Sequence, residues 1–318
     1  MKPNFEFARD LCIWTMSPFR SNGASALSSE TFSENAMQNH DSNLKNESEA
    51  YIHDVGYADR ERLEILTELY DPASRDFVLS QLPNDARSVL EIGCGHGQMA
   101  FWFTDQVRSR NGVVVGIDES QAQIDVCLHR RDERGIDNIR FIRHDMTSTL
   151  DIGQAFDVVY CRFVLAHITN WTTFFENVLS LCKDNGSIII EEPTTRRFSI
   201  PHHPSIPRSV ELLERLGEII NVKFNCAEPL WTYVQNIDVD IEAAQFTQPA
   251  LRSPRQKSLI WRSFDQIRDR LRELGLATSP EIEALDRDLR NIAEDDGYLL
   301  EGVRILHLHL RKRSPVRN

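Results

Sequence analysis

Five short apolar segments alternate with helical patterns between residues 85 and 195, and this rhythm constrains the fold most. The segments are short enough for buried strands, and they cover residues 88–93, 112–118, 139–145, 156–161 and 187–192. Amphipathic helices are expected among them, near residues 98–108, 120–133 and 170–183. Because parallel strands need crossover connections, the alternation predicts a doubly wound, mostly parallel α/β sheet.

The flanking segments follow other patterns. Helical spacing predicts one helix over residues 58–70 and a second near 73–81, before the first strand. Further helices are expected after residue 208, and strands near 233–244 and 304–313 should extend the sheet to seven strands, one of them antiparallel. Four prolines within residues 193–208 argue against a helix or strand there. The predicted organisation is a flexible polar leader (1–48), an N-terminal helical lid (49–84), a Rossmann-like cofactor-binding core (85–195), and acceptor-binding cap helices with the final strands (196–318).

Composition excludes several classes of protein. The formal net charge of −12 disfavours nucleic acid as a partner, because an acidic surface repels phosphate backbones. The six cysteines include no CxxC pair and no zinc-like Cys/His spacing, so we expect no metal site and reduced thiols. No apolar run reaches the roughly 18 residues of a membrane-spanning helix, and no signal peptide is recognised. These features predict a cytoplasmic protein without a membrane partner; a homodimer is compatible with them.

The segment VLEIGCGHG carries the strongest local motif. Gly93, Gly95 and Gly97 follow a buried strand, where they let the backbone turn tightly and approach a ligand. The next residue is Gln98, so the GxGxxG spacing of a dinucleotide fingerprint is missing. Glu91 lies just before the turn, and a carboxylate there favours a cationic group over a phosphate.

Acidic residues also end the second and third predicted strands. Asp118 could accept hydrogen bonds from both hydroxyls of a ribose, or it could cap the following helix. Asp145 could accept an adenine amino group while Met146 packs against the ring. Because the carboxyl ends of parallel strands share one edge, the three acids together predict a site for an adenosine with a cationic tail.

Over residues 85–195 the sequence resembles the class I methyltransferase family, which uses S-adenosyl-L-methionine. The acid-x-Gly-x-Gly-x-Gly motif, Asp118 and Asp145 carry the resemblance. GYADRERLEIL and CRFVLAHI look like a bacterial small-molecule branch that includes the teleocidin and prenyl diphosphate C-methyltransferases. The resemblance implies a cofactor site made of Glu91, Gly93, Cys94, Gly95, Gly97, Gln98, Asp118, Glu119, Asp145, Met146, Arg162 and Phe163.

The acceptor side begins after the fourth strand, where Arg162, Phe163 and His167 should lie over the cleft. The CRFV segment lacks the Pro-Pro-aromatic turn of methyltransferases that act on nucleic-acid amino groups. His167 is a candidate general base with a pKa near neutrality, or a helix-capping or packing histidine.

The loop after the fifth strand offers further candidates. His202 and His203 could take the proton. Arginines that could hold an anionic tail are Arg196, Arg197 and Arg208, and aromatic residues that could line the acceptor pocket are Phe198, Trp231 and Tyr233. By the resemblance, Tyr51 belongs to a lid over the active site, with Tyr57 as its substitute.

These features predict a methyltransferase that acts on a small, anionic or isoprenoid metabolite. Methyl transfer to carbon of a prenyl diphosphate and transfer to oxygen or nitrogen of a secondary metabolite both remain open. A cofactor-binding cyclase or regulator without transfer is the alternative from another class, because binding and catalysis use different residues.

Overall fold

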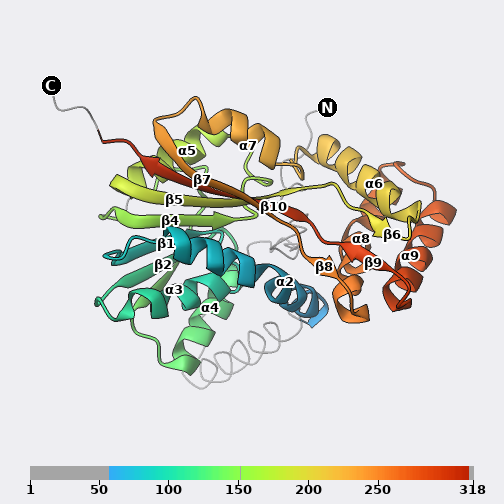
Figure 1. Cartoon of the computed structure of the whole chain (residues 1–318), viewed down its shortest axis with the longest axis horizontal. Helices are drawn as coiled ribbons and strands as arrows, with labels where there is room; N and C mark the ends of the chain where they lie inside the picture. The colour runs from blue at the N-terminus through green and yellow to red at the C-terminus, as the bar shows by residue number, and fades with distance from the viewer. Residues whose placement is uncertain (1–56, 151, 315–318) are drawn as a thin grey trace, which may run out of the picture.

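A seven-stranded sheet organises the protein in the computed structural model, which describes residues 57–150 and 152–314 (Figure 1). The strand order is β3-β2-β1-β4-β5-β10-β7. Neighbouring strands from β3 to β5 are parallel, and β10 is antiparallel to both β5 and β7. The strands are β1 (Ser88–Ile92), β2 (Val113–Asp118), β3 (Ile139–Arg143), β4 (Phe156–Arg162), β5 (Cys182–Thr194), β7 (Val239–Thr247) and β10 (Arg304–Lys312). The predicted doubly wound sheet with one antiparallel strand is confirmed.

Successive side chains of the central strands enter two different cores. Val89 and Val158 point to one face, whereas their neighbours Leu90 and Val159 point to the other. Helices α3 (Gln98–Arg108) and α4 (Gln121–Arg134) cover the first face, together with the end of α2. Helices α5 (Trp171–Leu181) and α7 (Ala227–Val234) cover the second. Burial on both sides explains why these strands are continuous apolar runs.

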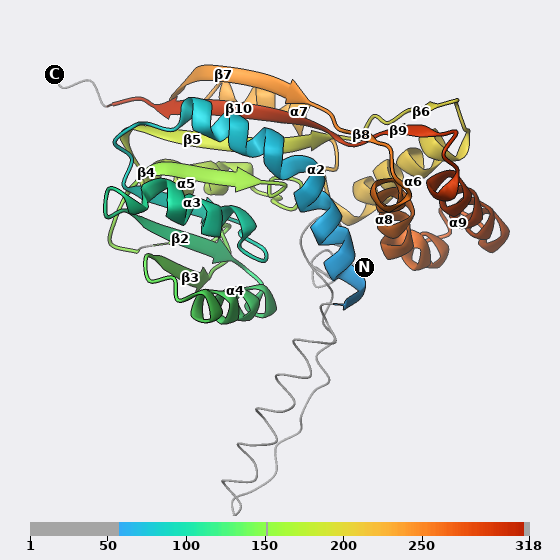
Figure 2. The ribbon, with the colours of Figure 1, turned by 60° about the horizontal axis from the view of Figure 1, so that its bottom comes forward.

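Helix α2 (Tyr57–Gln81) connects the sheet with the C-terminal helices. It runs across the sheet, and its earlier turns lie beside α8 (Pro254–Glu273), as Figure 2 shows. The expectation of two helices here is wrong, because α2 continues through Pro72. The proline removes one backbone donor, but Asp71 and Ser74 on either side of it both bind Arg162 of the sheet. Tertiary contacts therefore hold the helix across its weakest point.

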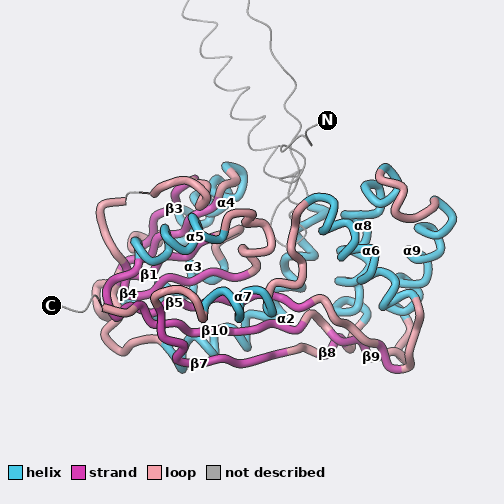
Figure 3. Tube along the Cα trace, turned by 90° about the horizontal axis from the view of Figure 1, so that it is seen from above, coloured by secondary structure: helices cyan, strands magenta, loops and turns pink. Residues whose placement is uncertain are grey.

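A second group of helices lies beside the carboxyl end of the central strands (Figure 2, Figure 3). It consists of α6 (Ser205–Ile220), α8 and α9 (Ser279–Glu294). A small sheet of β6 (Ser199–Ile200), β9 (Leu299–Glu301) and β8 (Ala250–Leu251) joins them. We call these elements the cap.

Two expectations for this part of the chain are wrong. The proline-rich segment was expected to hold no regular structure, yet β5 runs to Thr194 and α6 begins at Ser205. Pro207 falls in the first turn of α6, where a missing backbone donor costs nothing. The strand expected from residue 233 starts only at Val239, because Tyr233 belongs to α7.

Candidate cofactor site and acceptor side

The turn between β1 and α3 is built from three glycines with left-handed backbone conformations. The φ angle is 67° at Gly93, 52° at Gly95 and 76° at Gly97, a region that other residues rarely adopt. A Cβ on Gly93 would lie 2.4 Å from a methyl carbon of Val164. A Cβ on Gly95 would meet nothing within 4 Å, because Gly95 borders a cavity. The turn thus exposes bare backbone to open space at the end of β1.

That cavity lies between the glycine turn and helix α2. Predicted site residues that line it are Glu91, Gly93, Cys94, Gly95, Gln98, Arg162 and Phe163. Residues that line it without having been predicted are Leu63, Leu66, Thr67, His96 and Met99. The first three follow the spacing of a helix face, which in the sequence is indistinguishable from a face packed in the core. His96 belongs to the glycine motif itself, and this position in the sequence could have indicated that it lines the cavity.

Glu91 supplies the cavity with an unusual carboxyl group. Its side chain is 5% exposed, and its Oε2 atom finds no hydrogen-bond partner among the residues that the structure describes. Burial raises the pKa of Glu91 well above its ordinary value, and the nearby charge of Arg162 only partly opposes this. A bound ammonium group would satisfy the open oxygen and favour the ionised form. The residues present therefore fit a ligand with an amino group.

Asp118 connects the end of β2 to the glycine turn. Its Oδ2 accepts a hydrogen bond from the Gly95 backbone N–H at 2.9 Å, and its Oδ1 accepts one from Ser120 at 3.0 Å. Burial raises its pKa to about 6. Each oxygen keeps a second lone pair for a ligand hydroxyl. The helix-capping role belongs to Ser120, whose side chain accepts the Gln123 N–H of α4.

Asp145 and Met146 follow β3 at the same edge of the sheet. One oxygen of Asp145 accepts hydrogen bonds from the backbone and hydroxyl of Thr147, at 2.8 and 2.7 Å. Met146 is buried, and Asn177 of α5 donates to its carbonyl at 2.9 Å. Neither residue lines the cavity, and the same holds for Asp118 and its neighbour Glu119. The link to the cavity runs through the hydrogen bond between Asp118 and Gly95.

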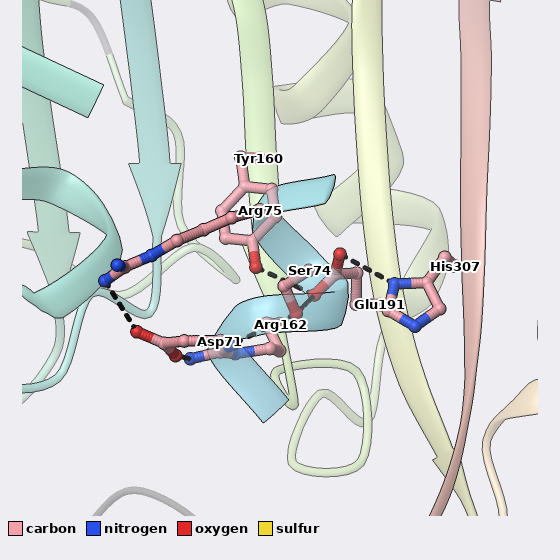
Figure 4. A network of polar contacts seen from close by, with 7 residues as sticks. All are labelled: Asp71, Ser74, Arg75, Tyr160, Arg162, Glu191 and His307. Carbon is pink, nitrogen blue, oxygen red and sulfur yellow. Dashed lines mark hydrogen bonds and ion pairs between the residues drawn. The ribbon is translucent and has the colours of Figure 1, made fainter. Parts of the chain in front are cut away.

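Arg162 and Phe163 form the opposite wall. Arg162 donates to Asp71 at 2.8 Å and to Ser74 at 3.0 Å, both on α2 (Figure 4). Burial opposes its charge, but the surrounding Tyr160, Asp71 and Glu191 raise the pKa of Arg162 overall. Phe163 has a φ of 60° and packs edge-on against Tyr70, with ring centroids 5.8 Å apart. A half-buried cation and a buried aromatic ring thus face the glycine turn.

The turn after Phe163 rests on Glu192 at the end of β5. One oxygen of Glu192 accepts the backbone N–H groups of Val164 and Leu165, at 2.9 and 2.8 Å. Burial raises the pKa of Glu192 to about 8. His167 closes the turn, and its Nε2 is buried with no hydrogen-bond partner within residues 57–150 and 152–314. Burial lowers the pKa of His167 to about 4, which contradicts the expected value near neutrality.

His202 and His203 lie in the cap, between β6 and α6, and neither lines the cavity. His202 is exposed. The Nδ1 of His203 accepts the Ser205 N–H at 3.3 Å, and its ring contacts Tyr298 with centroids 6.0 Å apart. The structure therefore does not bring this pair together with the cofactor motif, and its catalytic role stays a prediction.

The three predicted arginines have different surroundings. Arg196 is exposed, and Arg208 forms ion pairs with Glu211 and Glu281. Arg197 instead lines a cleft between α6 and α8, and burial lowers its pKa. Of the three, Arg197 is therefore the one placed to meet a ligand.

The aromatic residues assigned to the acceptor pocket do not gather. Phe198 and Trp231 are exposed, at 59% and 42%. Tyr233 stacks on Phe175 of α5, with ring centroids 4.9 Å apart. Tyr51 lies outside the described residues, and only the backbone of Tyr57 is described.

Comparisons with known proteins agree with this geometry. Residues 83–237 match the family described as a methyltransferase domain. The ubiquinone biosynthesis O-methyltransferase of Coxiella burnetii is 24% identical over 120 residues, which cover 38% of this chain and 49% of that protein. The aklanonic acid methyltransferase of Streptomyces sp. is 28% identical over 156 residues, 48% of this chain and 70% of that protein. The solved YcgJ protein of Bacillus subtilis has a TM-score of 0.52 at 17% identity, with 77% of this chain and 100% of that chain covered.

Residues 83–237 are therefore similar in sequence to a methyltransferase domain, and the chain shares the fold of the YcgJ protein. The chain spans about half the length of the ubiquinone biosynthesis relatives it matches. In the described part of the chain, no group of three or more histidine, cysteine or acidic residues could hold a metal ion. No described helix is both long and apolar enough to cross a membrane.

Proposed function

We propose that this protein is an S-adenosyl-L-methionine-dependent methyltransferase that acts on a small metabolite. The observation that carries the proposal is the open Oε2 of Glu91 in a cavity bordered by the bare backbone of Gly95. A cation with an adenosine body matches that carboxyl group and the acids at the ends of β2 and β3.

Each end of the cofactor has candidate residues in this proposal. The methionine amino group meets Glu91, and its carboxylate meets Arg162 and the backbone of the glycine turn. In the proposal, Asp118 and Glu119 bind the ribose hydroxyls, and Asp145 and Met146 bind the adenine. The remaining contacts come from Cys94, Gly97, Gln98 and Phe163.

When bound, the cofactor supplies a methyl group already activated on a sulfonium sulfur. The chain then has to align the acceptor, exclude water and accept one proton. We assign the proton to His167, because its Nε2 is buried without a hydrogen-bond partner among the described residues and burial favours the neutral ring. A base with a pKa of about 4 is weak, yet it suffices once methylation has made the departing proton strongly acidic.

The acceptor is inferred to combine an apolar body with an anionic group. The cleft beside Arg197 is otherwise mostly apolar, with Leu213, Ile260 and Phe264 in its walls. It also contains the Ser263 hydroxyl, which has no hydrogen-bond partner among the described residues. The positive charge of Arg197 partly opposes the rise that burial causes in the pKa of Tyr70. The Tyr70 ring in turn contacts Phe163 at the cofactor cavity. An acid or phosphate ester with a hydrocarbon chain fits these surroundings.

Two chemistries fit such an acceptor. Methylation at carbon of an isoprenoid diphosphate creates a carbocation, which the Phe163 and Tyr70 rings could face. Methylation at oxygen or nitrogen of a metabolite is favoured by the names of two relatives, a ubiquinone biosynthesis O-methyltransferase and an aklanonic acid methyltransferase.

Calorimetry with S-adenosylhomocysteine and with NADH tests the cofactor. We expect binding of S-adenosylhomocysteine with a Kd on the order of micromolar, and none of NADH. The reverse result would overturn the proposal. Incubation with isotope-labelled donor and a pooled metabolite extract, followed by mass spectrometry, then identifies the acceptor. Cofactor binding without any labelled product would indicate a cyclase or a regulator.

A further inference from the structure

A row of polar residues crosses the sheet beneath α2. Glu191 of β5 pairs in register with Arg162 of β4 on one side and with His307 of β10 on the other. The Tyr160 hydroxyl donates to Glu191 at 2.9 Å, and the Nδ1 of His307 lies 2.8 Å from the other oxygen. All of these groups are buried except Arg162, which is half-buried and lines the cofactor cavity. The row therefore ends at the proposed ligand.

Two residues of α2 complete the row from above (Figure 4). The Ser74 hydroxyl donates to Glu191 at 2.5 Å and accepts from Arg162 at 3.0 Å. Asp71 accepts from Arg162 at 2.8 Å and from Arg75 at 2.9 Å. Asp71 is 3% exposed and Ser74 is 0% exposed, so both acceptors are shielded from water. Such buried, charge-assisted bonds fix the direction of a guanidinium group.

The same helix supplies a wall of the cavity. Leu63, Leu66 and Thr67 lie one to two turns before Asp71 on α2. The bonds from Arg162 to Asp71 and Ser74 therefore set both the guanidinium on one side of the cavity and the helix on the other. Both also lie near Glu91, whose pKa responds to the charges of Arg162 and Asp71.

We infer that Asp71 and Ser74 are positioning residues that aim Arg162 at the carboxylate of the cofactor's methionine end. This inference rests on the proposed function. Arg162 has five N–H donors, and Asp71 and Ser74 occupy two of them. Among the described residues the other donors make no hydrogen bond, so they are available for a carboxylate beside the Glu91 carboxyl group that we assign to the amino group. Adenosine recognition uses other residues and should not depend on the pair.

The test compares two ligands that share the thioether nucleoside. S-adenosylhomocysteine carries the amino acid part, and 5′-methylthioadenosine lacks it. In Asp71→Asn, the affinity for S-adenosylhomocysteine should fall about 10-fold, as for a weakened bond to a charged group. The affinity for 5′-methylthioadenosine should stay within about twofold, because no contact to the nucleoside has changed. Ser74→Ala should show the same selectivity with a smaller loss.

Two controls separate this role from a general effect on α2. Asp76→Asn makes the same change of charge on an exposed position of α2 and should leave both affinities unchanged. In an Arg162→Lys background, Asp71→Asn should lose most of its effect, because the two residues act through one guanidinium. Thermal unfolding of each variant confirms that the protein is folded, and Ser74→Ala serves if Asp71→Asn is not.

Equal losses for both ligands would overturn the inference, because they would mean that α2 merely covers the site. Unchanged affinity for S-adenosylhomocysteine in both Asp71→Asn and Ser74→Ala would overturn it as well. If the unaltered protein binds neither ligand, the proposed function itself has failed, and that outcome is distinct from the first two.

Discussion

The two faces of the sheet treat neighbouring acids in opposite ways. Glu191 points to the face covered by α2, where burial alone would raise its pKa, but hydrogen bonds from His307 and Ser74 and the charge of Arg162 hold the pKa below its usual value. Glu192 points to the face covered by α7, where burial raises its pKa to about 8 and only backbone N–H groups oppose it.

The comparison shows that adjacent residues at the end of β5 have different roles because they lie on opposite faces of the sheet. Because adjacent side chains alternate, one residue joins the charged row at the cofactor cavity and the next supports the turn that carries His167. The α2 face is therefore expected to control cofactor binding, and the α7 face to control the acceptor side. Four changes test this division.

The largest effect is expected at the α7-face turn. Replacing the proposed base in His167→Ala should lower kcat about 10²- to 10⁴-fold. The Kd for S-adenosylhomocysteine should not change, because His167 does not line the cofactor cavity. Release of S-adenosylhomocysteine measures the rate once the acceptor is known, and calorimetry measures the Kd. His202→Ala is the matched control, because His202 is exposed in the cap. Normal turnover in His167→Ala, with a collapse in His203→Ala, would move the chemistry to the cap.

On the α2 face, Arg162→Ala should lower the free energy of unfolding by about 3–5 kcal/mol, because it leaves the buried Asp71 and Glu191 without their shared cation. Urea denaturation monitored by circular dichroism measures the loss. Arg196→Ala, at an exposed site, should change stability little. A loss below about 1 kcal/mol would show that water or rearranged side chains compensate the two acids.

Glu192→Gln should alter the pH dependence of stability. The Glu192 pKa is about 8 in the folded protein and 4.5 without the fold, so between these values the folded state holds a proton that the unfolded state has lost. Stability therefore falls as pH rises through this window, by up to about 1.4 kcal/mol per pH unit for one group. Glutamine can accept the same backbone bonds, so the variant should lack this share of the decline. Urea titrations at pH 5, 6, 7 and 8 measure the free energy of unfolding of both proteins. If it declines equally with pH in both, the proton is bound by another group, for instance Asp118.

Asp118→Ala is expected to give the smallest effect, a loss of about 1–3 kcal/mol in binding of S-adenosylhomocysteine, as for losing bonds to a charged group. Calorimetry gives the value. Affinity for 5′-methylthioadenosine should fall equally, because both ligands carry the ribose. That equality distinguishes Asp118 from Asp71 on the α2 face.

Local patterns were enough to predict the core of the fold. The apolar runs predicted the five parallel strands from β1 to β5, because burial on both faces leaves a continuous hydrophobic signal. Alternation predicted β7, which has exposed side chains, and the helical spacing predicted α3, α4 and α5. The glycine turn was equally predictable, since positive φ angles at Gly93, Gly95 and Gly97 demand glycine. Residues fixed to strand ends, such as Glu91, Asp118 and Asp145, followed directly from that topology.

The cap and helix α2 were less predictable because their contacts are distant in sequence. The histidines after β5 were placed near the cleft by their position in the chain, yet pairing of β6 with β9 carries the loop into the cap. The continuity of α2 through Pro72 depends on bonds from Arg162, which is about ninety residues away. A proline signal is local, whereas the contacts that override it are not.

The sequence by itself determined the class of sheet, the glycine turn and the acids at or near the strand ends, because each depends on residues adjacent in the chain. Only the tertiary structure decided the charge states and the far wall of the cavity. Glu191 and Glu192 are adjacent residues of the same type, so the sequence does not distinguish them. Their pKa values shift in opposite directions because they have different neighbours on the two faces of β5. Likewise, Leu63 and Thr67 line the cavity because their helix packs at the sheet, where Asp71 and Ser74 bind the half-buried Arg162.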